Sequence, residues 1–173
     1  MGRPKAALEW HGSTLVRRAA GIVGRAVGGP VLVVRAPGQE LPALPASMRL
    51  VEDPREGRGP LQGIAAGLAT LAGRAEVAFV SATDAPLLHP AFVRRVVASL
   101  DGAHDVALPV VHGHRHPLAA AYRVDLAEIA EELVAADRLA PAFLFERCRV
   151  RLLDEAALLG DPAVAAADPD LDS

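Results

Sequence analysis

Short, wholly apolar runs alternating with helical patterns constrain this chain's fold more than any other feature of its sequence. A short apolar run bounded by turn residues is typical of a strand buried on both faces of a sheet. We expect strands at residues 31–34, 48–52, 76–81, 105–111, 117–122 and 149–153. Apolar residues at helical spacing predict helices at 14–27, 59–72, 91–100, 126–136 and 140–146. Ser13 should cap the first of these helices and Gly28 should end it.

This alternation also predicts how the elements are arranged. Strands that alternate with helices form right-handed βαβ units, which place helices on both faces of a largely parallel sheet. No internal repeat and no long linker divides the 173 residues. We therefore expect one α/β domain over residues 1–173, a three-layer α/β/α Rossmann-like fold with a mostly parallel sheet.

Composition excludes several classes of protein. The net charge of −3 comes with scattered arginines, whereas a nucleic-acid polymer is bound by a clustered basic surface. Cys148 is the only cysteine, so no intrachain disulfide forms, and we interpret it as a small buried hydrophobe. No apolar run reaches the roughly 18 residues that a membrane span needs, and residues 1–5 are not a secretory signal. We expect a cytoplasmic protein that binds no membrane.

Ligands of such sheets bind beyond the carboxyl ends of the strands, here at residues 35–47, 53–59 and 81–89. Before the first predicted helix, Gly2 stands three residues ahead of Lys5. This spacing would let the backbone approach a polyphosphate while the ammonium group neutralises it. A solvated lysine near the chain terminus is the alternative interpretation.

A glycine-rich segment follows Asp53. Gly59, Gly63 and Gly67 lie at intervals of four residues and would line one helix face, although each weakens a helix by roughly 1 kcal/mol relative to alanine. Pro60 fits the first helical position. Either the helix packs closely against the sheet, or a nucleotide lies over its N-terminus, where N–H groups attract negative charge. Both interpretations stay open.

Asp84 follows the strand predicted at 76–81, in the segment Thr83-Asp84-Ala85-Pro86. A lone carboxylate there suits Mg²⁺, which takes one or two carboxylates together with substrate phosphates and waters. The alternative is an aspartate that caps the next turn.

Three alternating histidines, His112, His114 and His116, have the spacing of a metal cluster. No cysteine or nearby carboxylate completes a zinc ligand set, and Gly113 favours a turn. We interpret the segment as a surface loop that borders the cleft.

Taken in chain order, these stretches resemble the molybdenum cofactor guanylyltransferase branch of the nucleotidyltransferases. That family carries R-M-G-x-x-K, an aspartate before G-P-L-x-G, C/T-D-x-P after a strand, and an H/Q-P-L segment. The matching stretches here are Met1-Gly2-Arg3-Pro4-Lys5, Asp53 with Gly59-Pro60-Leu61-Gln62-Gly63, Thr83-Asp84-Ala85-Pro86, and His116-Pro117-Leu118. The resemblance covers residues 1–122.

The resemblance implies Mg²⁺-dependent transfer of GMP from GTP to a phosphate-bearing acceptor, a molybdopterin-type cofactor, with release of pyrophosphate. It implies catalytic roles for Lys5 on the triphosphate and for Asp84 on the metal. The implied nucleotide-binding set is Gly2, Lys5, Asp53, Gly59, Pro60, Leu61, Gly63 and Asp84. Molybdoenzymes or proteins of cofactor biosynthesis are the implied partners.

The chain also departs from the family pattern. The family's first strand and the first half of its phosphate loop, L-x-G-G-x-S-x-R, would precede Met1, and its N-x-N-T-P segment would follow residue 173. We therefore expect a chain truncated at both ends. Arg35-Ala36-Pro37 stands where relatives often have asparagine, which puts that base contact in doubt.

Three alternatives remain. One is a molybdopterin cytidylyltransferase, and another is a sugar-phosphate nucleotidyltransferase of the same fold. Gly59-Pro60-Leu61 favours the guanylyl branch over the cytidylyl one. The third is a non-catalytic nucleotide-binding remnant.

Overall fold

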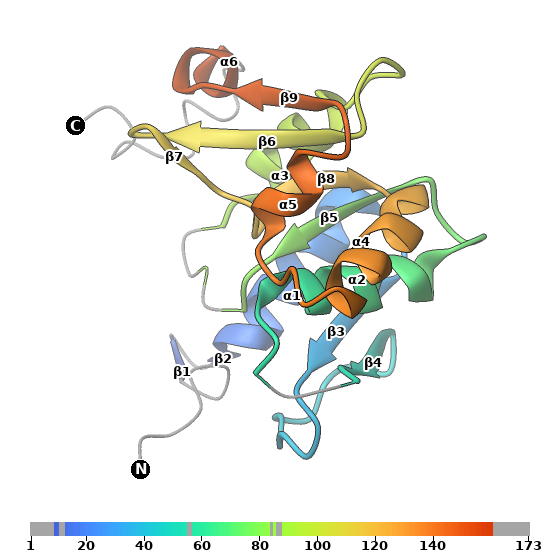
Figure 1. Cartoon of the computed structure of the whole chain (residues 1–173). Coiled ribbons are helices and arrows are strands. Elements are labelled where there is room, and N and C mark those ends of the chain that lie inside the picture. Colours follow the sequence, from blue (N-terminus) through green and yellow to red (C-terminus); the bar gives the residue numbers. More distant parts are fainter. Residues whose placement is uncertain (1–8, 11–12, 55–56, 84, 86–87, 161–173) are drawn as a thin grey trace.

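A computed structural model of the chain describes residues 9–10, 13–54, 57–83, 85 and 88–160 (Figure 1). Its helices are α1 (Leu15–Val27), α2 (Pro60–Leu71), α3 (Pro90–Ala98), α4 (Ala127–Ala135), α5 (Pro141–Phe145) and α6 (Glu155–Leu159), with the 3₁₀ helix η2 (Val124–Leu126). Its strands are β1 (Glu9–Trp10), β2 (Ser13–Thr14), β3 (Val31–Arg35), β4 (Met48–Glu52), β5 (Val77–Ser81), β6 (Val106–Val111), β7 (His114–Arg115), β8 (Ala119–Arg123) and β9 (Val150–Leu153). Every helix and strand expected from the sequence is present, within a few residues of its predicted ends.

The strands form a mixed arrangement. β3 pairs in parallel with β4, and β6 pairs in parallel with β9. β8 lies between β5 and β6 and is antiparallel to both. Residues 112–118, which contain the hairpin strand β7, are too short for the crossover that a parallel β8 would need. The sheet therefore combines parallel and antiparallel pairs.

Helices cover both faces of the sheet, which confirms the three-layer α/β architecture. In Figure 1, α2, α4 and α5 lie in front of the strands, and α1 and α3 lie behind them. Neighbouring residues of one strand point to opposite faces. Leu108 accordingly belongs to the core cluster shared with α2 and α4, whereas Ala107 belongs to a second cluster with Val96 of α3.

β3 and β5 each have one edge without a neighbouring strand in the described part of the chain. A cavity of about 860 Å³ lies against both strands, lined largely by the apolar side chains of residues 31–34 and 77–80. α1 and α2 contact both strands. We expected two fully buried strands, but in β3 only Val33 is buried and every residue of β5 is partly exposed. The cavity is the reason, because it leaves one side of each strand uncovered.

The caps differ from expectation in one place. The N-cap of α1 is Thr14, whose side chain makes no capping bond, and Ser13 belongs to β2, so the predicted Ser13 cap is wrong. Gly28 ends α1 as predicted, with a φ of 63° and its N–H donating to the Gly24 carbonyl. β1, β2, β7 and α6 were not anticipated, and three of them are two-residue strands.

Tyr122 of β8 and Cys148 pack in the core cluster between the sheet and the front helices. The Tyr122 hydroxyl donates to the Pro117 carbonyl at 2.8 Å, and burial raises the pKa of this phenol. Cys148 is half-buried against the same cluster, where burial raises the pKa of its thiol to about 11. The thiol is therefore neutral at physiological pH, as expected of a cysteine that serves packing. None of the helices in the described residues is long and apolar enough to cross a membrane.

Candidate functional site

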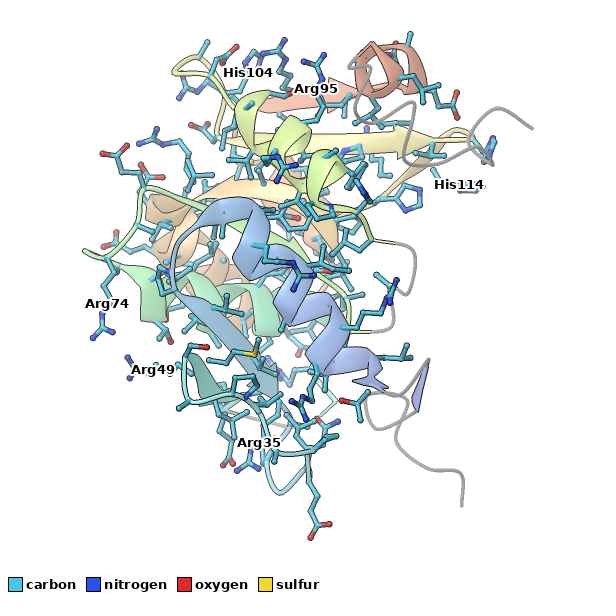
Figure 2. All side chains as sticks on the ribbon, turned by 180° about the vertical axis from the view of Figure 1, so that it is seen from behind. Arg35, Arg49, Arg74, Arg95, His104 and His114 are labelled. Atoms are coloured by element: carbon cyan, nitrogen blue, oxygen red, sulfur yellow. The ribbon has the colours of Figure 1, made fainter. Side chains whose placement is uncertain are left out.

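The site lies where β3, β4 and β5 end. The arrowheads of β3 and β5 point toward the same side of the molecule in Figure 1. Figure 2 shows this part of the fold from behind. Arg35 is the last residue of β3, and Arg74 follows the C-terminal end of α2. The cavity lining here becomes polar, with contributions from Arg35, Asp53, Gly59, Ser81 and Thr83. The three segments predicted as ligand-binding loops all supply lining residues.

Asp53 is held by both its backbone and its side chain. Its N–H donates to the Arg35 carbonyl at 2.7 Å, so the residue continues the β3–β4 ladder by one step. Its Oδ1 accepts a hydrogen bond from Nε2 of Gln62, in the first turn of α2. A Cβ built on Gly63 would lie 4.0 Å from Oδ2. The structure thus brings Asp53 and Gly63 together.

Gln62 is a residue of the site that sequence reasoning missed. Only 4% of it is exposed, which is unusual for glutamine, and its helix neighbours on the buried side are apolar. A polar residue at a buried position of an apolar helix is the signal that could have revealed it, because buried amides are nearly always hydrogen-bonded.

Gly59, which is the N-cap of α2, has different surroundings from Gly63 and Gly67 within the helix. Gly59 has a φ of 76°, and a Cβ there would lie 3.2 Å from the Leu139 carbonyl oxygen. A Cβ on Gly67 would lie 3.7 Å from Val34 Cγ2, an ordinary packing distance against β3. The positive φ and the close approach to Leu139 therefore account for Gly59, whereas an alanine would fit at position 67. Gly63 lines the cavity next to Asp53.

Arg58 anchors the loop before α2 to the end of α4. Its Nη2 donates to the Val134 carbonyl at 2.6 Å, and its Nη1 lies 2.9 Å from Oδ1 of Asp137. The Leu61 N–H donates to the Leu139 carbonyl at 3.3 Å, while the Leu61 side chain is fully buried in the core. These contacts fix the position of the Gly59-Pro60-Leu61 segment relative to the rest of the domain.

Replacing Arg58 with methionine should lower the free energy of unfolding by about 1–3 kcal/mol, because the substitution removes both the charged hydrogen bond to the Val134 carbonyl and the ion pair with Asp137. Urea unfolding measures the change. Arg147→Met is the matched control, since Arg147 forms an exposed pair with Glu132 of α4 at 3.6 Å and should contribute less than about 0.5 kcal/mol. Equal losses in the two variants would contradict an anchoring role for Arg58.

Arg35 occupies the position where relatives often have asparagine. Its guanidinium donates to the Gln39 carbonyl at 2.9 Å and to Glu52 at 3.0 Å. These bonds close the turn that follows β3 and tie it to β4. The doubt about a base contact at this position stands, because the side chain already serves the loop.

Comparison with known proteins identifies the family. Residues 1–152 match the MobA-like NTP transferase domain. The chain belongs to this family.

Relatives agree with the MobA-like assignment in sequence and in fold. The chain is 39% identical over 139 residues to a Mycobacterium avium protein named "Probable molybdenum cofactor guanylyltransferase", covering 78% of this chain and 68% of that protein. The structure of molybdopterin-guanine dinucleotide biosynthesis protein A from Archaeoglobus fulgidus is similar, with a TM-score of 0.67 and 16% identity over 95% of this chain and 89% of that one. A structure of an Aquifex aeolicus protein matches with a TM-score of 0.52 and 20% identity over 62% of this chain. The chain spans 55% of that protein, just over half its length.

Several predicted site residues of this MobA-like chain lie outside the described residues, namely Gly2, Lys5 and Asp84. Thr83, which directly precedes Asp84, lines the polar end of the cavity. Within the described ranges, Asp53 is the only acidic residue of the lining.

The histidine segment differs from expectation. His114 belongs to β7, which forms a hairpin with β6, and all three histidines are exposed. The His112 N–H donates to Oε1 of Glu155 at 2.6 Å. None of the three lines the cavity, so the predicted loop bordering the cleft is a short hairpin away from it. In the described part of the chain, no three His, Cys, Asp or Glu side chains are placed to hold a metal.

Proposed function

We propose that this chain transfers the GMP group of GTP to a phosphate-bearing acceptor of the molybdopterin type and releases pyrophosphate. The observation that carries the proposal is the position of Asp53 beside the Gly59–Gly63 segment, at the polar end of a cavity beyond the strand ends. Identity of 39% with a protein named as a molybdenum cofactor guanylyltransferase supports the choice of nucleotide and acceptor.

In this reaction an acceptor phosphate oxygen attacks the α-phosphorus of GTP. One P–O bond forms as the bond to the β-phosphate oxygen breaks, and pyrophosphate carries away the bonding electrons. The chemistry depends on in-line positioning and on neutralisation of charge more than on a protein nucleophile. We assign charge neutralisation at the triphosphate to Lys5 and Gly2, and contact with the base to Asp53 and the segment from Gly59 to Gly63.

The cation expected from the sequence is Mg²⁺. The described residues supply one carboxylate at the cavity for such a site. Among the described residues, Asp53 is the one carboxylate that lines the cavity, and its Oδ1 accepts a hydrogen bond from Gln62. The described residues alone therefore do not surround a metal ion. Magnesium is commonly held by one or two carboxylates with phosphates and waters, and Asp84, next to Thr83, is the carboxylate that we assign to it. When bound, the ion would neutralise charge that develops on the phosphates.

Three further assignments belong to the same proposal. We place the protein in the cytoplasm and expect molybdoenzymes or other biosynthesis proteins as its partners. A molybdopterin cytidylyltransferase is the second candidate. It would be favoured if the pocket accepted cytosine.

GTP should bind much more tightly than CTP. Guanine offers N1–H and N2–H donors, which Asp53 or loop carbonyls near Gly59 can accept, whereas cytosine would leave these acceptors unpaired. Calorimetric titration of the full-length protein with each nucleotide should give dissociation constants that differ by roughly 100-fold or more, since two hydrogen bonds to a charged acceptor are lost. Equal affinities would overturn the guanylyl assignment and favour the cytidylyl one.

A further inference from the structure

The inference concerns Gln62 and rests on the proposed function. Gln62 is 4% exposed, and its Nε2 donates to Oδ1 of Asp53. Its neighbours Leu61 and Ile64 are buried in the apolar core. Burial of an amide among apolar groups is costly unless the amide is hydrogen-bonded, so the position has to serve a specific bond.

The two residues are fixed by separate elements. Asp53 is attached to the end of β4, with its N–H on the Arg35 carbonyl at 2.7 Å. Gln62 belongs to the first turn of α2, which Arg58 and the Leu61 N–H fasten to the end of α4. The hydrogen bond between their side chains therefore joins two rigid supports. It removes rotational freedom from the carboxylate.

A carboxylate can accept hydrogen bonds from two adjacent donors only when its plane is correctly oriented. Guanine presents such a pair, N1–H and N2–H, on one edge. With Oδ1 bonded to Gln62, the plane of the Asp53 carboxylate is set, and Oδ2 is placed on the Gly63 side, where a Cβ would lie 4.0 Å away. Glycine at position 63 adds no side-chain atom on this side of the carboxylate.

We infer that Gln62 is a positioning residue that orients Asp53 and thereby sets the preference for guanine. Gln62 itself need not touch the nucleotide. Its loss should reduce discrimination between bases more than it reduces binding of triphosphates in general.

The test compares GTP with inosine triphosphate, whose base lacks only the 2-amino group. Gln62→Met keeps a side chain of similar length and removes the donor. The ratio of the two dissociation constants, measured by calorimetry on the whole chain, should fall about tenfold, the equivalent of one hydrogen bond to a charged group. In the Asp53→Asn background, the same Gln62 substitution should leave the ratio unchanged, because the two residues act as a unit.

Thr70→Val is the matched control. Thr70 is also in α2, and its hydroxyl donates to the Ala66 carbonyl at 2.8 Å, so the variant loses one side-chain bond of the same helix without touching Asp53. It should leave the GTP-to-inosine-triphosphate ratio at the wild-type value. If Gln62→Met fails to fold, Gln62→Leu also removes the donor and has the same expected loss of preference.

The outcomes separate the two proposals. A full-length wild-type protein that does not bind GTP refutes the proposed function and this inference with it. A wild-type preference for GTP over inosine triphosphate that survives in a folded Gln62 variant overturns the inference alone. A loss of preference in Gln62→Met but not in Thr70→Val supports it.

Discussion

Turnover should fall by roughly 100-fold or more when Asp84 is replaced by asparagine in the complete gene product, because catalysis of phosphoryl transfer depends on charge placed next to the phosphates. Asparagine keeps the shape of the side chain but removes the negative charge that would attract Mg²⁺. The measurement is pyrophosphate release at limiting and at saturating Mg²⁺. Part of the loss should be recovered as the ion concentration rises.

A control separates this effect from a general change in charge. Asp125→Asn removes a carboxylate that is 66% exposed and paired with Arg123 at 3.3 Å, so its turnover should equal that of the wild type. Unchanged turnover of Asp84→Asn at limiting Mg²⁺ would remove Asp84 from the mechanism.

The second large effect concerns the cavity between β3 and β5. Among the described residues, no strand pairs with the edge of β3 or of β5 that faces the cavity, and unpaired backbone groups in an apolar interior are unfavourable. We propose that an extended apolar segment encoded upstream of Met1 occupies this cavity as a strand parallel to β3. Addition of such a segment, about 15–20 residues for a strand with its Gly-Gly-x-Ser-x-Arg loop, should raise the melting temperature by about 10 °C.

The expected gain follows from burial. Burial of five apolar side chains of the strand contributes about 1.5–3 kcal/mol each, opposed by about 1–2 kcal/mol of lost backbone freedom for each of those same five strand residues. A net gain of about 3 kcal/mol corresponds to the stated shift for a domain of this size. The melt should also become more cooperative, and transferase activity should appear with the loop.

A matched extension of the same length, with serine and lysine in place of the apolar residues, is the control. It should leave the melting temperature of the 173-residue chain unchanged. An equal gain from both extensions, or a 173-residue chain that is already fully active with a cooperative melt, would contradict the proposal.

The sequence predicts the elements of this fold well because their apolar runs are short and clear. Residues 31–34 and 48–52 contain the strands that the structure shows, and Pro60 marks the first residue of α2. The direction of each strand was harder to predict from the sequence. Periodicity is the same in a parallel and an antiparallel strand, so the orientation of β8 depends on the short segment 112–118, which was interpreted as a loop.

Residues of the candidate site could be predicted only where few other structural roles explain that residue type at that position. Gly63 was singled out by its spacing from Gly59 and Gly67, and Asp53 by the resemblance to the family pattern, and the structure brings the two together. Gln62 and Arg58 were missed, because each acts through a contact that sequence spacing does not encode. The guanidinium of Arg58 bonds to a carbonyl 76 residues away. Whether Gly2, Lys5 and Asp84 join this site stays a prediction.

That long separation has a consequence for how the chain acquires its shape during synthesis. β3, β4 and α2 come from one continuous stretch and can associate as soon as they leave the ribosome, whereas contacts between distant residues form only after the chain between them closes. The segment that precedes α2 is fastened by Val134, Asp137 and Leu139. We therefore expect nascent chains shorter than about 139 residues to hold a sheet but no fixed base pocket, so that recognition of a nucleotide matures last.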